Sequence, residues 1–132
     1  MMKVLRFEEL EVWKDARVIC GSVNEICNVG SFRSDYKFRD QVRSSAGSIM
    51  DNIAEGFERD GRKEFIQFLS IAKGSCGEIR SQLYRAIDYG YISAEKAAGL
   101  LEQTLVLSKK LSCLMTYLKS SQIKGLKFKP ET

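Results

Sequence analysis

The residues best suited to nucleophilic or metal chemistry are four cysteines, which stand apart in the sequence without a CxxC pair and without any histidine. Zinc sites in proteins draw on cysteine and histidine at short spacing, so this distribution does not suggest a metal site. Each cysteine falls at a position of an apolar periodicity, which predicts reduced, buried thiols at Cys20, Cys27, Cys76 and Cys113. Cys20 and Cys27 share one helix face, and a redox pair remains the alternative.

Carboxylates and hydroxyls give no stronger indication of catalysis. Glu55 and Glu78 could face each other across a helical bundle, as in di-iron proteins, but such sites add Glu-x-x-His motifs. Ser44, Ser45 and Ser75 have no candidate base nearby, and neither a nucleophile-elbow nor a phosphate-loop pattern is present. The sequence therefore predicts a protein that is not an enzyme and holds no metal or cofactor.

The stretch of residues 39–56 has the periodicity of a helix but shows three faces instead of two. One face is apolar (Val42, Ile49, Ile53), one is polar (Gln41, Ser45, Ser48, Asn52, Glu55), and one is small (Ala46, Gly47, Met50, Ala54). A helix with a second smooth face can meet a second neighbour. That neighbour lies in the same chain or in another copy, and the residues leave both possibilities open.

Small residues recur in the middle of the following helix, at Gly74, Ser75 and Gly77. Each glycine there costs about 1 kcal/mol relative to alanine, which predicts a compensating close approach of the preceding helix. An antiparallel arrangement places Gly74 and Ser75 opposite residues 43–45, and Glu78 near Arg39. Glu55 opposes the helix dipole at the expected helix end, so we expect donors of the next helix to hold it. The set that fixes the two helices is then Asn52, Glu55, Gly74, Ser75 and Glu78. With Gln41, Ser45, Ser48 and Gly56 it forms the predicted motif for helix packing or oligomer contacts.

Four long helices account for most of the chain. They are expected from Glu8 or Glu9 to Asn28, from Tyr36 to Glu55 with Gly56 just after the end, from an N-cap at Asp60 to near Gly90, and from an N-cap at Ser93 to near Ser120. Residues 29–35 are expected to be a loop. Short connections favour an all-α, antiparallel, up-down-up-down four-helix bundle as one domain over residues 1–120, followed by a basic tail over 121–132 that we expect to be disordered.

Composition agrees with a soluble globular protein, with 44% hydrophobic and 29% charged residues. No apolar run approaches the roughly 20 residues that cross a bilayer, and acidic residues interrupt the first segment where a signal peptide would be apolar. These features predict a cytoplasmic protein without a membrane partner.

Basic residues offer a second kind of function, the binding of RNA. The net charge is +4, and most of it lies in the last fourteen residues. Acidic residues dilute the cluster around residues 59–63, so a solvated charged turn is the alternative. The candidate contacts are Arg39, Arg43, Arg59, Arg62, Lys63, Lys124, Lys127 and Lys129.

Several motifs of the chain resemble a bacterial family, that of proteins encoded in intervening sequences of 23S ribosomal RNA genes. The motif NIAEG and the downstream GSxxE carry the resemblance at Asn52–Gly56 and Gly74–Glu78, together with Phe7, Leu10, Val12, Trp13, Asp40, Gln41, Ser48, Ile49, Phe65, Phe68, Leu69, Ala72 and Lys73. The resemblance covers residues 7–118. It implies a left-handed four-helix bundle that assembles into a homopentamer, with a largely unassigned function.

A more distant relative is the accessory variability protein of diversity-generating retroelements, a basic pentamer that works with a reverse transcriptase and RNA. The resemblance therefore implies an oligomeric scaffold that binds RNA, a nucleic-acid enzyme or another protein. A purely structural adaptor without nucleic acid is the alternative.

Overall fold

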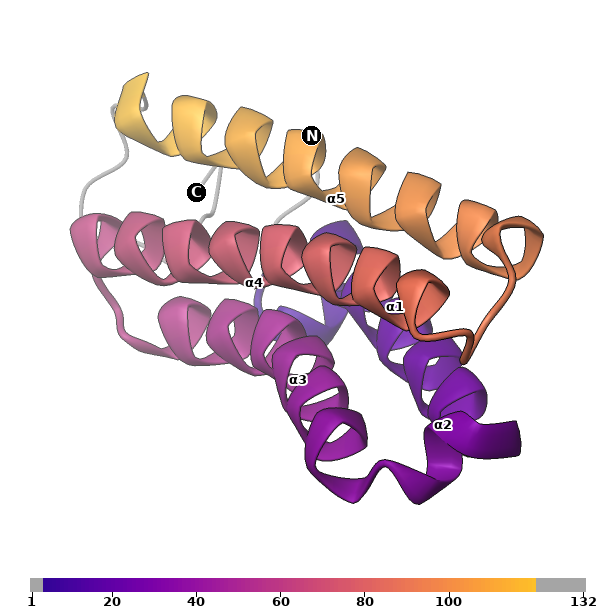
Figure 1. The fold of residues 1–132 in the computed structure, drawn as a ribbon. Helices are drawn as coiled ribbons and strands as arrows, with labels where there is room; N and C mark the ends of the chain where they lie inside the picture. Colours follow the sequence, from indigo (N-terminus) through magenta and orange to yellow (C-terminus); the bar gives the residue numbers. More distant parts are fainter. Residues whose placement is uncertain (1–3, 121–132) are drawn as a thin grey trace.

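The computed structural model describes residues 4–120, and these residues form helices and connections without a β-strand. A short 3₁₀ helix, Phe7–Glu9, precedes α1 (Glu11–Cys27). Then follow α2 (Gly30–Ser34), α3 (Tyr36–Glu58), α4 (Arg62–Asp88) and α5 (Ala94–Ser120) (Figure 1). The predicted all-α class is confirmed.

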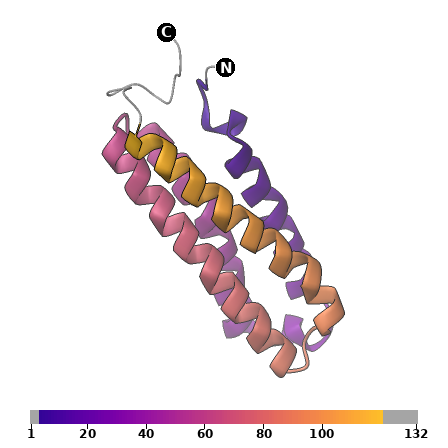
Figure 2. The same ribbon diagram turned by 90° about the horizontal axis from the view of Figure 1, so that it is seen from above.

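The four long helices form a ring of neighbours, in which α1 and α4 each contact both α3 and α5. Figure 2 shows the long helices lying side by side along roughly one direction. The short connections between α3, α4 and α5 reverse the chain each time, as expected for an antiparallel bundle. Within the described part of the chain, no helix combines the length and the apolar character that a membrane span requires.

The core is built from one apolar stripe of each long helix. On α1 the buried positions are spaced by three and four residues, and on α3 the predicted core residues Val42, Ile49 and Ile53 are buried. Leu107 and Leu111 of α5 close the core from the other side. The helical period therefore determined which face of each helix turns inward.

Residues 29–35 are not the expected loop, because they contain α2. Phe32 in α2 is fully buried, and its ring stacks on Phe38 at 5.5 Å and on Tyr91 at 5.3 Å between centroids. A helix of five residues has too few internal hydrogen bonds to be stable alone. Burial of Phe32 explains why it forms here.

Asp35 ties this corner of the bundle together. Its carboxylate accepts a hydrogen bond from the backbone N–H of Phe38 at 3.2 Å and so caps α3, and it accepts a second from the hydroxyl of Tyr91 at 2.7 Å. The bond from Tyr91, and then that from the Phe38 N–H, hold the pKa of Asp35 below its ordinary value. The connection between α4 and α5 is thereby attached to the start of α3.

Several predicted helix ends shift by a few residues. The first long helix begins at Glu11 and not at Glu8 or Glu9, because Glu9 ends the 3₁₀ turn, where its carboxylate accepts from the N–H of Leu5 at 2.9 Å. Asp60 is not the N-cap of α4, since it has a positive φ of 61° and Gly61 takes the cap position. The predicted N-cap Ser93 is confirmed, because its hydroxyl accepts from the N–H of Lys96 at 3.1 Å.

Candidate functional site: the polar face between α3 and α4

Polar side chains from the middle of α3 and α4 meet in a ladder of hydrogen bonds. The hydroxyl of Ser75 donates to the hydroxyl of Ser48 at 3.0 Å. About two turns further along α4, the amide nitrogen of Gln82 donates to the hydroxyl of Ser45 at 3.1 Å. Ser45, Ser75 and Gln82 are all buried. The polar stripe of α3 therefore packs, at least in part, within its own chain.

Gln82 is the member of this ladder that the sequence analysis missed. Its position was visible in principle, because residues 75, 78 and 82 follow one another at helical spacing on one face of α4. The register between the helices is also different from the predicted one. Ser75 faces Ser48 and not residues 43–45.

Asn52 and Glu55 do not bridge the two helices as expected. The side-chain amide of Asn52 donates to the carbonyl and the hydroxyl of Ser48, both within α3, at 2.8 and 2.9 Å. Glu55 forms an ion pair with Arg59 at 2.7 Å, one turn further along the same helix. Because α3 continues to Glu58, Arg59 is within reach of Glu55. Both side chains are about half exposed, so this pair contributes little to stability.

The close approach of α3 and α4 lies at Gly56 and not at Gly74 or Gly77. Gly56 is buried inside α3, and a Cβ atom built there would lie 2.6 Å from the Cβ of Phe68. The prediction that Gly56 follows the helix end is therefore wrong. A Cβ at Gly74 would meet nothing within 4 Å, and one at Gly77 would meet only the side chain of Arg80 at 4.0 Å. Packing among residues 4–120 does not explain the two mid-helix glycines of α4.

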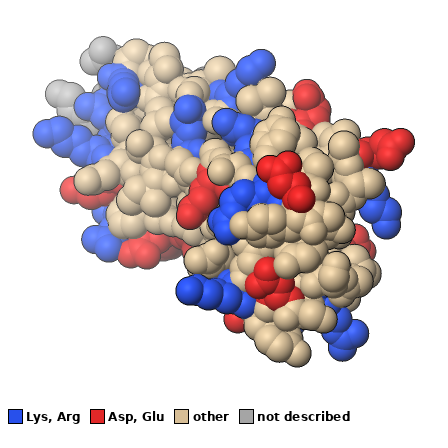
Figure 3. Space-filling model, in the orientation of Figure 1, with Lys and Arg blue, Asp and Glu red and all other residues tan. Residues whose placement is uncertain are grey.

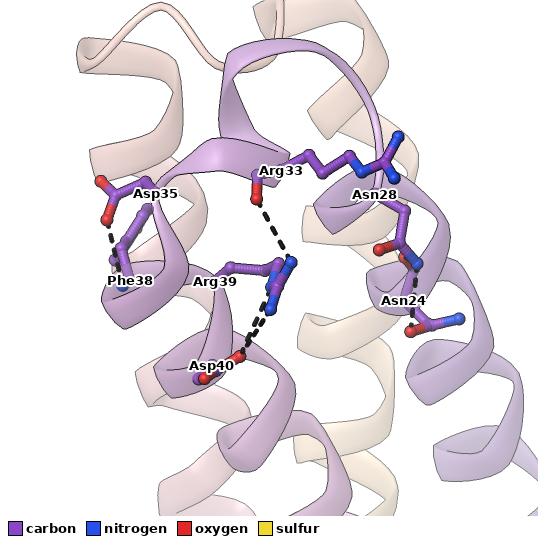
Figure 4. Close-up of polar contacts among 7 residues, drawn as sticks. All are labelled: Asn24, Asn28, Arg33, Asp35, Phe38, Arg39 and Asp40. Carbon is purple, nitrogen blue, oxygen red and sulfur yellow. Dashed lines mark hydrogen bonds and ion pairs between the residues drawn. The ribbon is translucent and has the colours of Figure 1, made fainter.

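Arg39 turns away from α4. Its guanidinium donates to the carbonyl of Arg33 at 3.2 Å, forms an ion pair with Asp40 at 3.4 Å, and lies 5.1 Å from the ring centroid of Tyr36. Figure 4 shows this bridge between the end of α2 and the start of α3, with Asp35 capping α3 on the other side. Among the described residues the predicted pair of Arg39 with Glu78 does not form.

The remaining basic candidates lie in two other places. Arg43 lines a hollow of about 420 Å³ between α1 and α3, together with Cys20 and Asn24. Arg59, Arg62 and Lys63 surround the connection between α3 and α4, where the guanidinium of Arg59 lies 5.1 Å from the ring of Phe68. Lys124, Lys127 and Lys129 lie outside the described residues.

The surface charge is mixed over the face drawn in Figure 3. Lys and Arg gather most densely toward the end of the molecule where α5 finishes, and elsewhere they alternate with Asp and Glu. No continuous basic surface covers the described part of this face. On this face, attraction of a polyanion is therefore local to particular residues.

The cysteines occur as free thiols with different exposure. Cys27 and Cys76 are buried, and desolvation raises the pKa of each thiol to about 11. Cys20 is half-buried, whereas Cys113 is exposed, so the prediction that all four are buried is wrong for these two. Cys20 lies at the edge of the buried face of α1, and Cys113 lies on the solvent-facing side of α5. Among residues 4–120 no group of three or more Cys, Asp or Glu residues could hold a metal ion.

The fold and its polar inner face define the class of protein as a four-helix bundle. The family model of 23S rRNA-intervening sequence proteins matches residues 8–113. The chain belongs to this family, whose function is unknown.

A solved structure agrees with this assignment. It is the crystal structure of a protein with unknown function from the S23 ribosomal protein family of Bacteroides thetaiotaomicron, similar with a TM-score of 0.71 and 20% identity over 79% of this chain and 97% of that chain. At this identity the similarity supports the fold alone. The comparison with curated proteins found no match.

Proposed function

We propose that this protein is a non-catalytic, cytoplasmic scaffold that associates with copies of itself and presents a surface to RNA or to a protein partner. The observation that carries the proposal is the exposed small-residue face of α4. Ser70, Gly74, Gly77 and Ser81 follow one another at helical spacing, and all are exposed except Gly77, which is partly buried. Among residues 4–120, nothing lies within 4 Å of a Cβ built at Gly74. Two glycines in the middle of a helix cost about 1 kcal/mol each, so a benefit outside the chain is the simplest explanation. The family resemblance favours a homopentamer.

Replacing Gly74 with leucine tests self-association. The side chain has free space in the single protomer, and leucine favours a helix, so the protomer should keep its helix content. If another copy packs against this face, the added side chain should weaken association by about 1–3 kcal/mol, roughly 5- to 150-fold in the dissociation constant. Light scattering after size exclusion, over a dilution series, measures the mass.

Gly99 of α5 is the matched control for this variant. It is also exposed, and a Cβ there would also meet nothing within 4 Å. Gly99→Leu should leave the mass unchanged. A Gly74→Leu protein with the mass of the wild type at every dilution, or a wild-type monomer, would contradict the proposed interface.

RNA binding at the connection between α3 and α4 is the second candidate. Arg59, Arg62 and Lys63 come together there from two helix ends. The triple variant Arg59→Glu, Arg62→Glu, Lys63→Glu should abolish binding of a structured ribosomal RNA fragment, and the wild-type affinity should fall with salt. Filter binding at low and moderate salt measures both. Unaltered binding by the triple variant would exclude this site and leave a protein partner, such as a reverse transcriptase, or a purely structural role.

A further inference from the structure

A polar groove lies between the first half of α3 and the second half of α4. In Figure 1 the first half of α3 diverges from α4. The groove has a volume of about 620 Å³, within the roughly 300–1,000 Å³ of ligand sites in proteins. Serine hydroxyls from α3 and longer polar side chains from α4 line it.

Charge is sorted along this groove. Lys37 and Arg85 lie at the end nearest the connection between α4 and α5. Glu78 precedes Arg85 by two helical turns, which is about 10 Å along the axis of α4. Asp40 also lines the cationic end, but its carboxylate is paired with Arg39 at 3.4 Å. One end therefore favours an anion, and the other offers a negatively charged acceptor.

Gln82 lies between these two ends with an acceptor that has no partner. The side chain is only 6% exposed, and its amide nitrogen donates to Ser45. Its amide oxygen is buried and makes no hydrogen bond within residues 4–120. A buried acceptor without a partner is costly, and the last torsion of a glutamine side chain is soft. Rotation about that torsion would exchange the oxygen with the nitrogen and break the bond to Ser45, so the acceptor that a ligand hydroxyl reaches in this groove is the exposed carboxylate of Glu78.

An exposed aromatic ring lies next to the cationic end, outside the lining of the groove but in contact with Arg85. The guanidinium of Arg85 lies 4.5 Å from the ring centroid of Phe38 and 5.6 Å from that of Tyr89, and it donates to the Tyr89 hydroxyl at 3.4 Å. Phe38 is buried, whereas Tyr89 is 51% exposed. Tyr89 is thus an aromatic surface fixed beside a guanidinium, an arrangement on which unpaired bases stack.

We propose that this groove binds one dinucleotide step of single-stranded RNA. A base stacks on Tyr89, Lys37 and Arg85 hold the phosphodiester that follows, and the 2′-hydroxyl of the next ribose donates to Glu78. Tyr89 just after α4, then Arg85 and then Glu78 within α4 follow one another in the order of base, phosphate and ribose along a strand. A 2′-hydroxyl is what separates RNA from DNA at such a site. This site is distinct from the small-residue face of α4 proposed for self-association, and from the basic cluster at the connection between α3 and α4.

The test compares octauridylate with octadeoxyuridylate, which differ only in the 2′-hydroxyl. Fluorescence polarisation of labelled strands at low salt should show tighter binding of the RNA. Tyr89→Ala should weaken RNA binding about tenfold, whereas Tyr89→Phe should keep the wild-type affinity. Glu78→Ala should reduce the preference for RNA over DNA about tenfold. Uridine monophosphate should compete poorly and the dinucleotide UpU well, because the site spans two nucleotides.

Tyr84→Ala is the matched control, because Tyr84 is a similarly exposed tyrosine of α4, whereas Tyr89 accepts a hydrogen bond from Arg85, which lines the groove. Equal affinity for RNA and DNA, or equal loss in the Tyr84 and Tyr89 variants, would overturn the proposal. The proposal would also be overturned if the triple variant of Arg59, Arg62 and Lys63 lost RNA binding while Tyr89→Ala and Glu78→Ala bound RNA as tightly as the wild type. If Glu78→Ala changes the mass in light scattering but not RNA affinity, a second copy covers the groove and the proposal fails. The proposed self-association is tested separately, because light scattering measures the mass of the protein and not its affinity for RNA.

Discussion

Replacement of Gly56 by alanine should destabilise the protein by about 1–3 kcal/mol, although alanine is the better helix former. The new Cβ would lie 2.6 Å from the Cβ of Phe68 and 3.2 Å from the ring of Phe65. The Cβ of Phe68 belongs to a residue inside α4, so it cannot move without shifting that helix. The gain of about 1 kcal/mol from helix propensity is therefore smaller than the cost of forcing α3 and α4 apart.

Gly47 supplies the control for this variant, because it lies in the same helix and a Cβ there would meet nothing within 4 Å. Gly47→Ala should raise the free energy of unfolding by up to about 1 kcal/mol. Urea unfolding followed by circular dichroism, at a protein concentration held constant, measures both variants. The close approach would be refuted if Gly56→Ala were as stable as Gly47→Ala.

Phe32→Ala should lower the free energy of unfolding by about 3–5 kcal/mol, the largest effect we expect from a single truncation. Phe32 is fully buried, and its ring stacks on Phe38 and Tyr91. Removal of the ring leaves a cavity where α2, the start of α3 and the connection between α4 and α5 meet. The loss should therefore appear first as faster hydrogen exchange of the amides in α2 and in the first turn of α3.

Val29 is the control for this truncation. It lies three residues before Phe32 in the sequence, but its side chain is exposed. Val29→Ala should change the free energy of unfolding by no more than about 0.5 kcal/mol. If Phe32→Ala lowered the free energy of unfolding by no more than Val29→Ala does, the packing around Phe32 would not stabilise the bundle.

The sequence by itself determined the four long helices and most of their inward faces. Apolar residues recur every three or four positions, and this period is a local property that any stretch of chain carries. Val42, Ile49 and Ile53 are buried as predicted, and Ser93 caps α5 as predicted. The same pattern could not predict α2, because a helix of five residues is too short to show a period. This helix depends on the burial of Phe32, which is a tertiary contact.

The tertiary structure alone decided which polar and small residues meet. Helical periodicity gives the face of a residue but not its axial position against a neighbouring helix. A shift of about one turn moved Ser75 to Ser48 and separated Glu78 from Arg39. The same register places the close approach at Gly56, leaves free space at Gly74, and brings Gln82 and Arg85 into one groove with Lys37, with Tyr89 next to Arg85. Axial register depends on how bulky side chains of both helices interdigitate over their whole length, which no single stretch of sequence contains.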